Sequence, residues 1–163
     1  MNNKVEASIF RRGSTTYYFS SRFFPEPVRT HVFQLYSFVR VADNYVDELP
    51  AQPEKLLALE ERWRAAEATP RFDTVVTPDD DVDTRVIKNL MNVSGRYGFE
   101  PDWIEAFFAA MKADIHPIPF ATITDTLGYV YGSAEVIGLM MAKVMGLPTE
   151  ALPAEALQGR AMQ

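Results

Sequence analysis

The sequence predicts an all-α protein, because hydrophobic residues recur at helical spacing along most of the chain and no convincing strand-like alternation appears. Prolines and glycines also stand where helices are expected to begin and end. With 163 residues, of which 47% are hydrophobic and 23% charged, the chain is long enough for one domain with a hydrophobic core. We therefore expect a bundle of helices.

The helices can be placed in order along the chain. A short first helix is expected to end near Gly13, and the others are expected at residues 25–48, 53–68, 84–97, 101–114, 122–145 and 153–163. Proline is favoured in the first turn of a helix and glycine just after its end, as Pro53 and Gly98 illustrate. The apolar stretch at 127–145 carries Glu135 and Lys143, so it is interpreted as a core helix rather than a membrane span.

The acidic loop at residues 69–83 imitates a calcium-binding loop without being one. Its three alternating aspartates resemble the start of an EF-hand. The sixth position is Thr84 instead of glycine, however, and the twelfth is Leu90 instead of glutamate. We interpret this segment as a solvated loop that caps the next helix.

Bulk composition excludes several classes of function. The net charge of −6 and the pI of about 4.9 argue against a nucleic-acid partner, although a local basic pocket for a small phosphate is still allowed. The absence of cysteine excludes disulfides and thiolate zinc sites and fits a reducing compartment. Because the N-terminus has no apolar signal core, we expect a cytoplasmic protein, with peripheral membrane association kept as an alternative.

The most informative segment is the helix at residues 25–48, which is apolar on most of its surface but carries one charged stripe. Tyr36, Arg40, Asp43 and Asp47 fall within an arc of about 60° at helical spacing. The two aspartates are one turn apart, where like charges repel each other and a cation would turn repulsion into attraction. This stripe is either a surface face with an arginine–aspartate ion pair or a metal-and-anion site inside a helical cavity. We favour the second reading, because a helix that is apolar almost all round is usually buried.

Two further segments fit a ligand site without defining one. Residues 13–19 combine hydroxyl groups, which can contact phosphate, with aromatic rings, although serine and threonine also cap helices. Small residues recur every four positions in the helix at 122–145, as at Ala134 and Gly138. They indicate either close helix packing or a groove for a long apolar ligand, walled by Ile137, Leu139, Met140 and Met141.

Taken together, these residues resemble the squalene/phytoene synthase family of head-to-head prenyl synthases. The resemblance is carried, in the family's order, by GSTTYY at 13–18, FP at 24–25, LY at 35–36, Arg40, DNYVD at 43–47, GYVYGSAEVIGLMM at 128–141 and GRAMQ at 159–163. It spans nearly the whole chain. Although a DxxxD pattern alone is weak, the ordered set is highly specific.

The resemblance implies an isoprenoid-synthase-type helical bundle around a central cavity in which two prenyl diphosphates bind with Mg²⁺. One diphosphate would ionise, the double bond of the second chain would attack the allylic cation, and a cyclopropyl intermediate would rearrange. Two geranylgeranyl diphosphates, as for phytoene synthase, are the expected substrates. The alternatives are squalene or dehydrosqualene synthesis from farnesyl diphosphate and a non-catalytic family member that acts as a binding or assembly factor.

By matching position, the resemblance assigns roles to individual residues. Asp43 and Asp47 would bind Mg²⁺, while Arg40 and Tyr36 would contact diphosphate. The other expected substrate-binding residues are Gly13, Ser14, Thr15, Thr16, Tyr17, Asp114, Tyr129, Ala134, Ile137, Gly138 and Gln163.

This sequence departs from the family pattern in three respects. Thr15 stands where relatives often carry a basic residue, and Glu135 stands where they usually carry a small one. The second aspartate-rich motif of the family would follow Gln163, so we expect residues 1–163 to be the N-terminal part of a single isoprenoid synthase domain. On its own, this part is expected to be inactive.

Overall fold

The computed structural model describes residue 6 and residues 23–69 and 72–148, and every regular element within these ranges is helical. The elements are α3 (Val28–Asp47), α4 (Pro53–Glu67), α5 (Val82–Tyr97), α6 (Pro101–Ile115), α7 (Ile123–Val130), the π-helical turn η2 (Tyr131–Glu135) and α8 (Val136–Val144). The all-α prediction is confirmed, and the helix ends lie close to those predicted. The helices expected before Gly13 and after residue 153 fall outside the described residues.

The helix ends follow the local chemistry of the sequence. Pro53 and Pro101 occupy the first turns of α4 and α6. The Asp81 side chain accepts a 2.6 Å hydrogen bond from the Thr84 backbone N–H at the start of α5, which confirms the interpretation of the acidic loop as a helix cap. Gly98 ends α5 in the left-handed region with φ of 63°, where a residue without Cβ is favoured.

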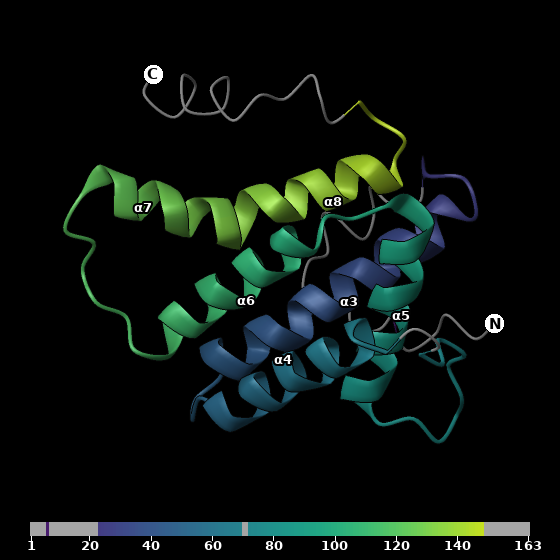
Figure 1. Ribbon diagram of the computed structural model, residues 1–163, viewed down its shortest axis with the longest axis horizontal. Coiled ribbons are helices and arrows are strands. Elements are labelled where there is room, and N and C mark those ends of the chain that lie inside the picture. The colour runs from purple at the N-terminus through teal and green to yellow at the C-terminus, as the bar shows by residue number, and fades with distance from the viewer. Residues whose placement is uncertain (1–5, 7–22, 70–71, 149–163) are drawn as a thin grey trace.

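Helix α3 is the central element of the bundle. It packs against α4, α5, α6 and α8, and α8 also packs on α6. Figure 1 shows α7, η2 and α8 running as one long rod along the top of the molecule, above α6, with α3 and α4 below. Because of this arrangement, the C-terminal end of α3 and the C-terminal end of α6 can contribute side chains to the same region as α7.

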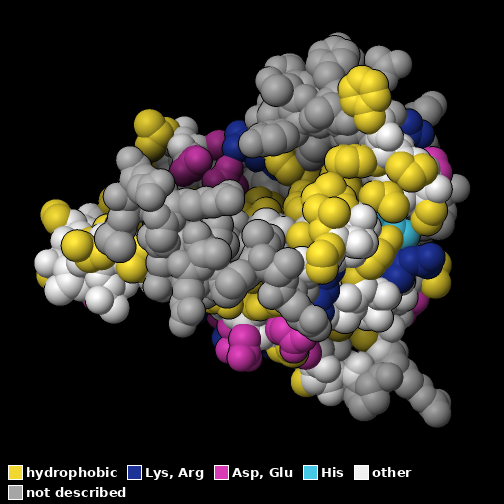
Figure 2. Space-filling view, turned by 90° about the horizontal axis from the view of Figure 1, so that it is seen from above, with side chains coloured by type: hydrophobic (Ala, Val, Ile, Leu, Met, Phe, Trp, Pro, Cys, Tyr) yellow, Lys and Arg dark blue, Asp and Glu magenta, His cyan; other side chains and the backbone are white. Residues whose placement is uncertain are grey.

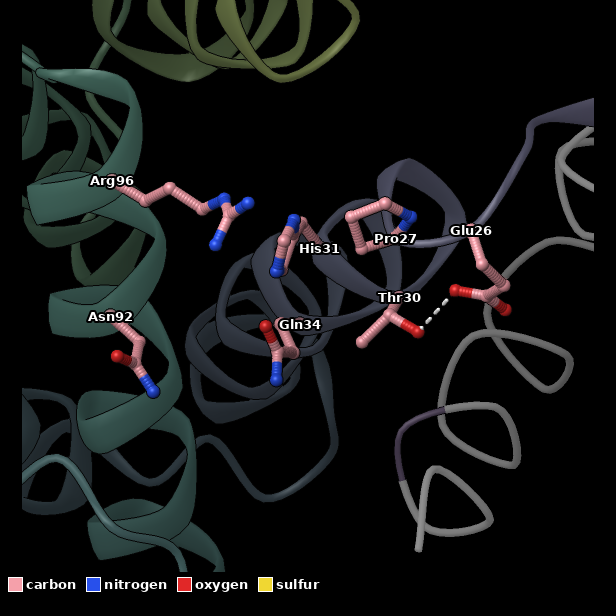
Figure 3. A pocket seen from close by; sticks show the side chains of 7 residues that line it. All are labelled: Glu26, Pro27, Thr30, His31, Gln34, Asn92 and Arg96. Atoms are coloured by element: carbon pink, nitrogen blue, oxygen red, sulfur yellow. Dashed lines mark hydrogen bonds between the residues drawn. The ribbon is translucent and has the colours of Figure 1, made fainter. Parts of the chain in front are cut away.

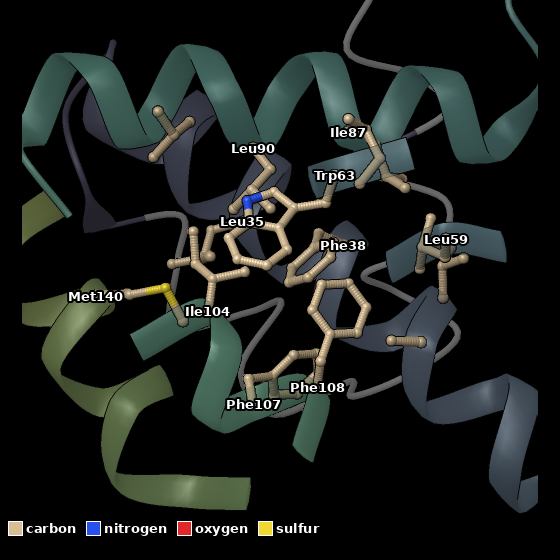
Figure 4. Packing of buried hydrophobic residues seen from close by; sticks show 14 of the residues in the cluster. Leu35, Phe38, Leu59, Trp63, Ile87, Leu90, Ile104, Phe107, Phe108 and Met140 are labelled. Atoms are coloured by element: carbon tan, nitrogen blue, oxygen red, sulfur yellow. The ribbon is translucent and has the colours of Figure 1, made fainter. Parts of the chain in front are cut away.

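Aromatic rings from three helices fill the core (Figure 4). The Phe38 ring centroid lies 5.3 Å from that of Phe107 and 5.6 Å from that of Phe108, which in turn lies 5.6 Å from Trp63. Such contacts add to the hydrophobic stabilisation from burying these large side chains. Leu35, Phe38, Leu56, Leu59, Leu90, Phe108, Val136 and Met140 are completely buried.

The long helix predicted at 122–145 is present but differs from the prediction in two ways. It is interrupted by the π-helical turn η2, and α7 has no buried side chain. The core-helix interpretation is therefore confirmed for α8, which buries Val136 and Met140, and is wrong for α7. The reason is that α7 extends along the top of the molecule beyond the helices that pack under α8 (Figure 1). None of the helices in the described ranges is both long and apolar enough to cross a membrane.

Candidate functional site

The charged stripe of α3 lies near the C-terminal end of the helix. The Arg40 guanidinium donates a 2.5 Å hydrogen bond to Asp43, and about a third of each side chain is exposed (35% and 32%). Asp47, one turn further on, is exposed, whereas Tyr36 is half-buried against the core. The stripe therefore runs from the half-buried Tyr36, which packs against the core, to the exposed Asp47, and its negatively charged side chains lie at the exposed end.

A second group of polar residues comes from α6, α7 and η2. The Tyr129 hydroxyl group donates to the Asp114 carboxylate, with oxygen–oxygen distances of 2.8 and 3.1 Å. Burial raises the pKa of the Tyr129 hydroxyl, and the bond to Asp114 raises it further, although a hydrogen bond with Ser133 opposes both effects. Tyr129 therefore stays protonated and remains a hydrogen-bond donor at neutral pH.

These two groups are electrostatically coupled, so they form one acidic cluster. Burial raises the pKa of Asp43, and the negative charges of Asp47 and Asp114 raise it further, while the ion pair with Arg40 opposes the rise. The charge of Asp47 also acts on Tyr129. The cluster, defined here as Asp43, Asp47, Asp114 and Tyr129, holds more negative charge than the single arginine balances.

Such a cluster has oxygen ligands that suit a hard divalent cation. Mg²⁺ is usually held by one or two carboxylates together with water and substrate phosphates, so the two α3 aspartates fit a partial site of this kind. Within the described part of the chain, no three histidine, cysteine, aspartate or glutamate side chains are arranged to hold a metal ion by themselves. A cation bound here would therefore need further oxygen ligands.

The structure contains features of both interpretations of the α3 stripe. The arginine–aspartate ion pair expected of a surface face is present, and Asp47 is exposed. The enclosed setting that we predicted for both aspartates is not seen in the described residues. Asp43 does show the partial burial and mutual repulsion expected of a cation site. The sequence overestimates the burial because α3 is enclosed by neighbouring helices at its centre and less so near its end.

The small residues of the long helix lie in two different environments, one closely packed and one open. A Cβ atom added at Gly132 would lie 2.4 Å from the Ala106 carbonyl oxygen, so this glycine allows close packing on α6. A Cβ at Gly138 would meet nothing within 4 Å, and Ala134 is also exposed. In Figure 2, hydrophobic side chains gather on this face toward α8. The packing reading holds at Gly132, and an open apolar surface exists at Gly138.

Among the proposed groove walls, Ile137 and Met141 are half-buried, whereas Met140 is completely buried in the core and cannot line a groove. The expectation for Met140 is therefore wrong, because its side chain points to the opposite side of α8 from Gly138. The remaining expected substrate-binding residues lie outside the described residues: Gly13, Ser14, Thr15, Thr16, Tyr17 and Gln163.

Sequence reasoning missed two features. Ser133, one turn further along the helix, lowers the pKa of Tyr129, and its spacing of four residues within the quoted motif was the available signal. His31, to which the sequence assigns no role, bonds to Tyr97 and lines a pocket at the other end of α3. Nothing in the sequence pattern brings these residues of α3 and α5 together.

The fold and the acidic cluster define an all-α protein with carboxylates on facing helices. Comparison with known proteins places it in a family. A model of the squalene/phytoene synthase family matches residues 10–163, and the chain belongs to this family. No significant match to a solved structure was found.

The curated relatives are phytoene synthases. The chain is 28% identical over 163 residues to the phytoene synthase of Thermus thermophilus, covering 98% of this chain and 52% of that one. It is 27% identical to the 15-cis-phytoene synthases of Paracoccus sp. and Pantoea ananas, covering 83% and 90% of this chain and 44% and 47% of theirs. The chain thus spans about half the length of the curated relatives that it matches.

Proposed function

We propose that this chain supplies the N-terminal half of a prenyltransferase that joins two prenyl diphosphates head to head with loss of diphosphate, as in phytoene synthesis. The observation that carries the proposal is the acidic cluster. In a chain of this family, it places Asp43 in an ion pair with Arg40, with Asp47 one turn further along α3, and the charges of Asp47 and Asp114 both act on Asp43. We propose two geranylgeranyl diphosphates as substrates.

Each residue of the cluster has a part in this chemistry. Asp43 and Asp47 would hold Mg²⁺, which when bound neutralises the charge of a departing diphosphate. Arg40 supplies a positive charge beside Asp43, where it can contact diphosphate oxygens. The Tyr129 hydroxyl, kept protonated, offers a hydrogen-bond donor at the edge of the cluster.

The apolar surface next to the cluster suits the prenyl chains. Ala134 and Gly138 leave space on the exposed side of the η2–α8 segment, with Ile137 beside them. An apolar wall would protect an allylic cation from water. The chain matches only about half the length of each relative, so we propose that residues 1–163 alone make no product.

A chimeric enzyme tests this proposal. Residues 1–163 would replace the matching part of the Thermus thermophilus phytoene synthase, and the product would be analysed after feeding geranylgeranyl or farnesyl diphosphate separately with Mg²⁺. We expect phytoene from the C20 substrate. Asp43→Asn and Asp47→Asn should each reduce its formation about a hundredfold or more. Asp79→Asn, an exposed loop aspartate, is the matched control and should retain activity.

The outcomes separate the alternatives. A product formed only from farnesyl diphosphate would replace the phytoene assignment with a squalene-type one. A chimera that unfolds cooperatively but makes no product from either substrate would contradict the catalytic assignment. Retention of activity in both Asp→Asn variants would contradict the metal-binding role of the α3 aspartates.

A further inference from the structure

A pocket lined mainly by polar residues lies at the N-terminal end of α3, against the C-terminal part of α5. It has a volume of about 530 Å³. Figure 3 shows the Arg96 and Asn92 side chains extending from α5 toward His31 and Gln34 of α3, with Glu26, Pro27 and Thr30 on the far side. His31 lies twelve residues before Asp43 on the same helix, which places the two roughly 18 Å apart along the axis. The pocket is therefore separate from the acidic cluster.

The charges around this pocket are not balanced inside it. The Glu26 carboxylate is already satisfied, because it accepts bonds of 2.9 and 2.7 Å from Arg29 and one of 2.7 Å from Thr30. Arg96 is an exposed side chain at the rim of the pocket, and its guanidinium has no hydrogen-bond or ion-pair partner within residues 23–69 and 72–148. In a chain with a net charge of −6, an arginine of this kind in a concave site is a local positive centre.

The groups around Arg96 can also donate hydrogen bonds. Gln34 is only 4% exposed, yet its amide lines the pocket. The His31 Nδ1 atom lies 2.8 Å from the Tyr97 hydroxyl oxygen, which fixes the ring orientation. When Tyr97 donates to Nδ1, the other ring nitrogen carries a proton and is available as a donor. A guanidinium, two amides and an imidazole together form a donor-rich site that suits oxygen acceptors.

We propose that this pocket binds a small oxyanion, either a phosphate or a carboxylate group, between Arg96 and His31. Arg96 supplies the charge and the Gln34 amide a directed donor, while the Asn92 amide, which donates one N–H to the Thr74 carbonyl oxygen (3.4 Å), has a second N–H left to offer. Burial and the positive charge of Arg96 lower the pKa of His31, and the negative charge of Glu26 opposes them in part, so an anion placed between Arg96 and His31 should raise that pKa again. This site is independent of the proposed prenyltransferase activity, because it uses no residue of the acidic cluster.

Nuclear magnetic resonance of the two histidine rings tests the proposal directly. The chain contains only His31 and His116, and His116 is exposed in the linker after α6, so it serves as an internal reference. Residues 1–163 would be titrated with inorganic phosphate in one experiment and with acetate in another, at constant ionic strength. We expect a saturable shift of the His31 resonances and no saturable shift of His116.

Two variants with the same change of charge complete the test. Arg96→Gln should weaken binding about tenfold or more, because it removes the charge-assisted contact. Arg62→Gln changes an equally exposed arginine that does not line the pocket and contacts Asp81 and Thr84 at the opposite end of α5, and binding should stay within about twofold. Saturation by phosphate only, or by acetate only, identifies which group the pocket accepts. The proposal is overturned if neither anion saturates His31, or if the two variants bind equally well.

Discussion

The Tyr129 hydroxyl group donates a 2.8 Å hydrogen bond to Asp114, across the linker between α6 and α7. Helix α7 has no buried side chain, and this bond is one of the described contacts that position it, together with the Phe120 ring 5.1 Å from the Tyr129 ring and the packing of Gly132 of η2 on α6. Asp114 in turn acts on the pKa of Asp43. One tyrosine therefore links the position of an exposed helix to the electrostatics of the acidic cluster.

Tyr129→Phe should loosen α7 without unfolding the bundle. The change removes one hydrogen bond to a charged acceptor, and we expect a loss of about 1 kcal/mol in the local free energy of opening. Hydrogen exchange of the α7 amides should therefore accelerate by roughly fivefold, while the core amides of α3 keep their protection. Tyr131→Phe is the matched control. Equal exchange rates of α7 in the two variants would show that the Asp114 bond does not anchor the helix.

Gly132→Ala and Gly138→Ala should have opposite effects on stability. At Gly132 the new Cβ would overlap the Ala106 carbonyl and lie 3.0 Å from the Ala110 Cβ, and overpacking of this kind costs about 1–3 kcal/mol. At Gly138 the same methyl group enters open space, so the higher helix propensity of alanine should add up to about 1 kcal/mol. Urea unfolding measures both. A Gly132→Ala variant as stable as Gly138→Ala would contradict the close packing on α6.

The helix boundaries could be predicted because their signals are local. Pro53, Pro101 and Gly98 restrict or release the backbone at their own positions. The Asp81 side chain caps α5 by accepting from a backbone N–H only three residues away. The buried side of α3 could also be predicted from its apolar surface, as Phe38 shows. These features depend on residues that are neighbours in the sequence.

The features that could not be predicted depend on tertiary contacts. The apolar pattern of α7 resembles that of α8, yet only α8 has helices beneath it, so the sequence cannot separate them. The π-helical turn leaves the hydrophobic pattern almost unchanged. The convergence of Asp114 with Asp43, and of Arg96 with His31, is set by how the helices cross, which single-sequence periodicity does not specify.

An ion-pair network between α4 and α6, centred on a buried glutamate, should make stability depend on acid pH. Glu60, whose side chain is 8% exposed, accepts bonds from Lys112 and Arg64. Burial would raise the pKa of Glu60, but these bonds outweigh it and lower the pKa below its ordinary value of 4.5. A carboxylate with a lowered pKa stabilises the fold above its unfolded-state pKa, and this contribution is lost as the pH falls through the folded-state value.

Lys112→Met should remove part of that dependence. Leaving the buried carboxylate without one of its donors should cost about 1–3 kcal/mol at pH 7, and the cost should shrink as the pH is lowered and Glu60 becomes protonated. Unfolding midpoints measured between pH 3 and 7 test this. Glu60→Gln, a neutral isostere, is the reference with a flatter profile. A Lys112→Met penalty that stays constant across this range would show that the network is not the cause.

The opposite sign is expected in the acidic cluster. The pKa of Asp43 is raised, so the folded state favours its protonated form, and this stabilisation is lost as the pH rises through the folded-state pKa. Asp47→Asn removes a negative charge that contributes to the rise, so it should lower the pKa of Asp43. Carboxyl carbon NMR titration of residues 1–163 measures that pKa. Asp79→Asn, in the exposed loop, should leave it unchanged.

Magnesium should act on the same titration. A cation bound by ionised carboxylates disfavours their protonation, so adding Mg²⁺ with inorganic diphosphate should lower the pKa of Asp43 in a saturable way. The effect should weaken in Asp47→Asn, because only one of the two α3 carboxylates is left to bind. Ca²⁺, which is larger and takes more ligands, should be the weaker competitor at a site completed by phosphate oxygens. A pKa of Asp43 that responds neither to Asp47→Asn nor to Mg²⁺ would mean that the two aspartates do not act as a pair. The exposed position of Asp47 would then reflect only a solvated helix end.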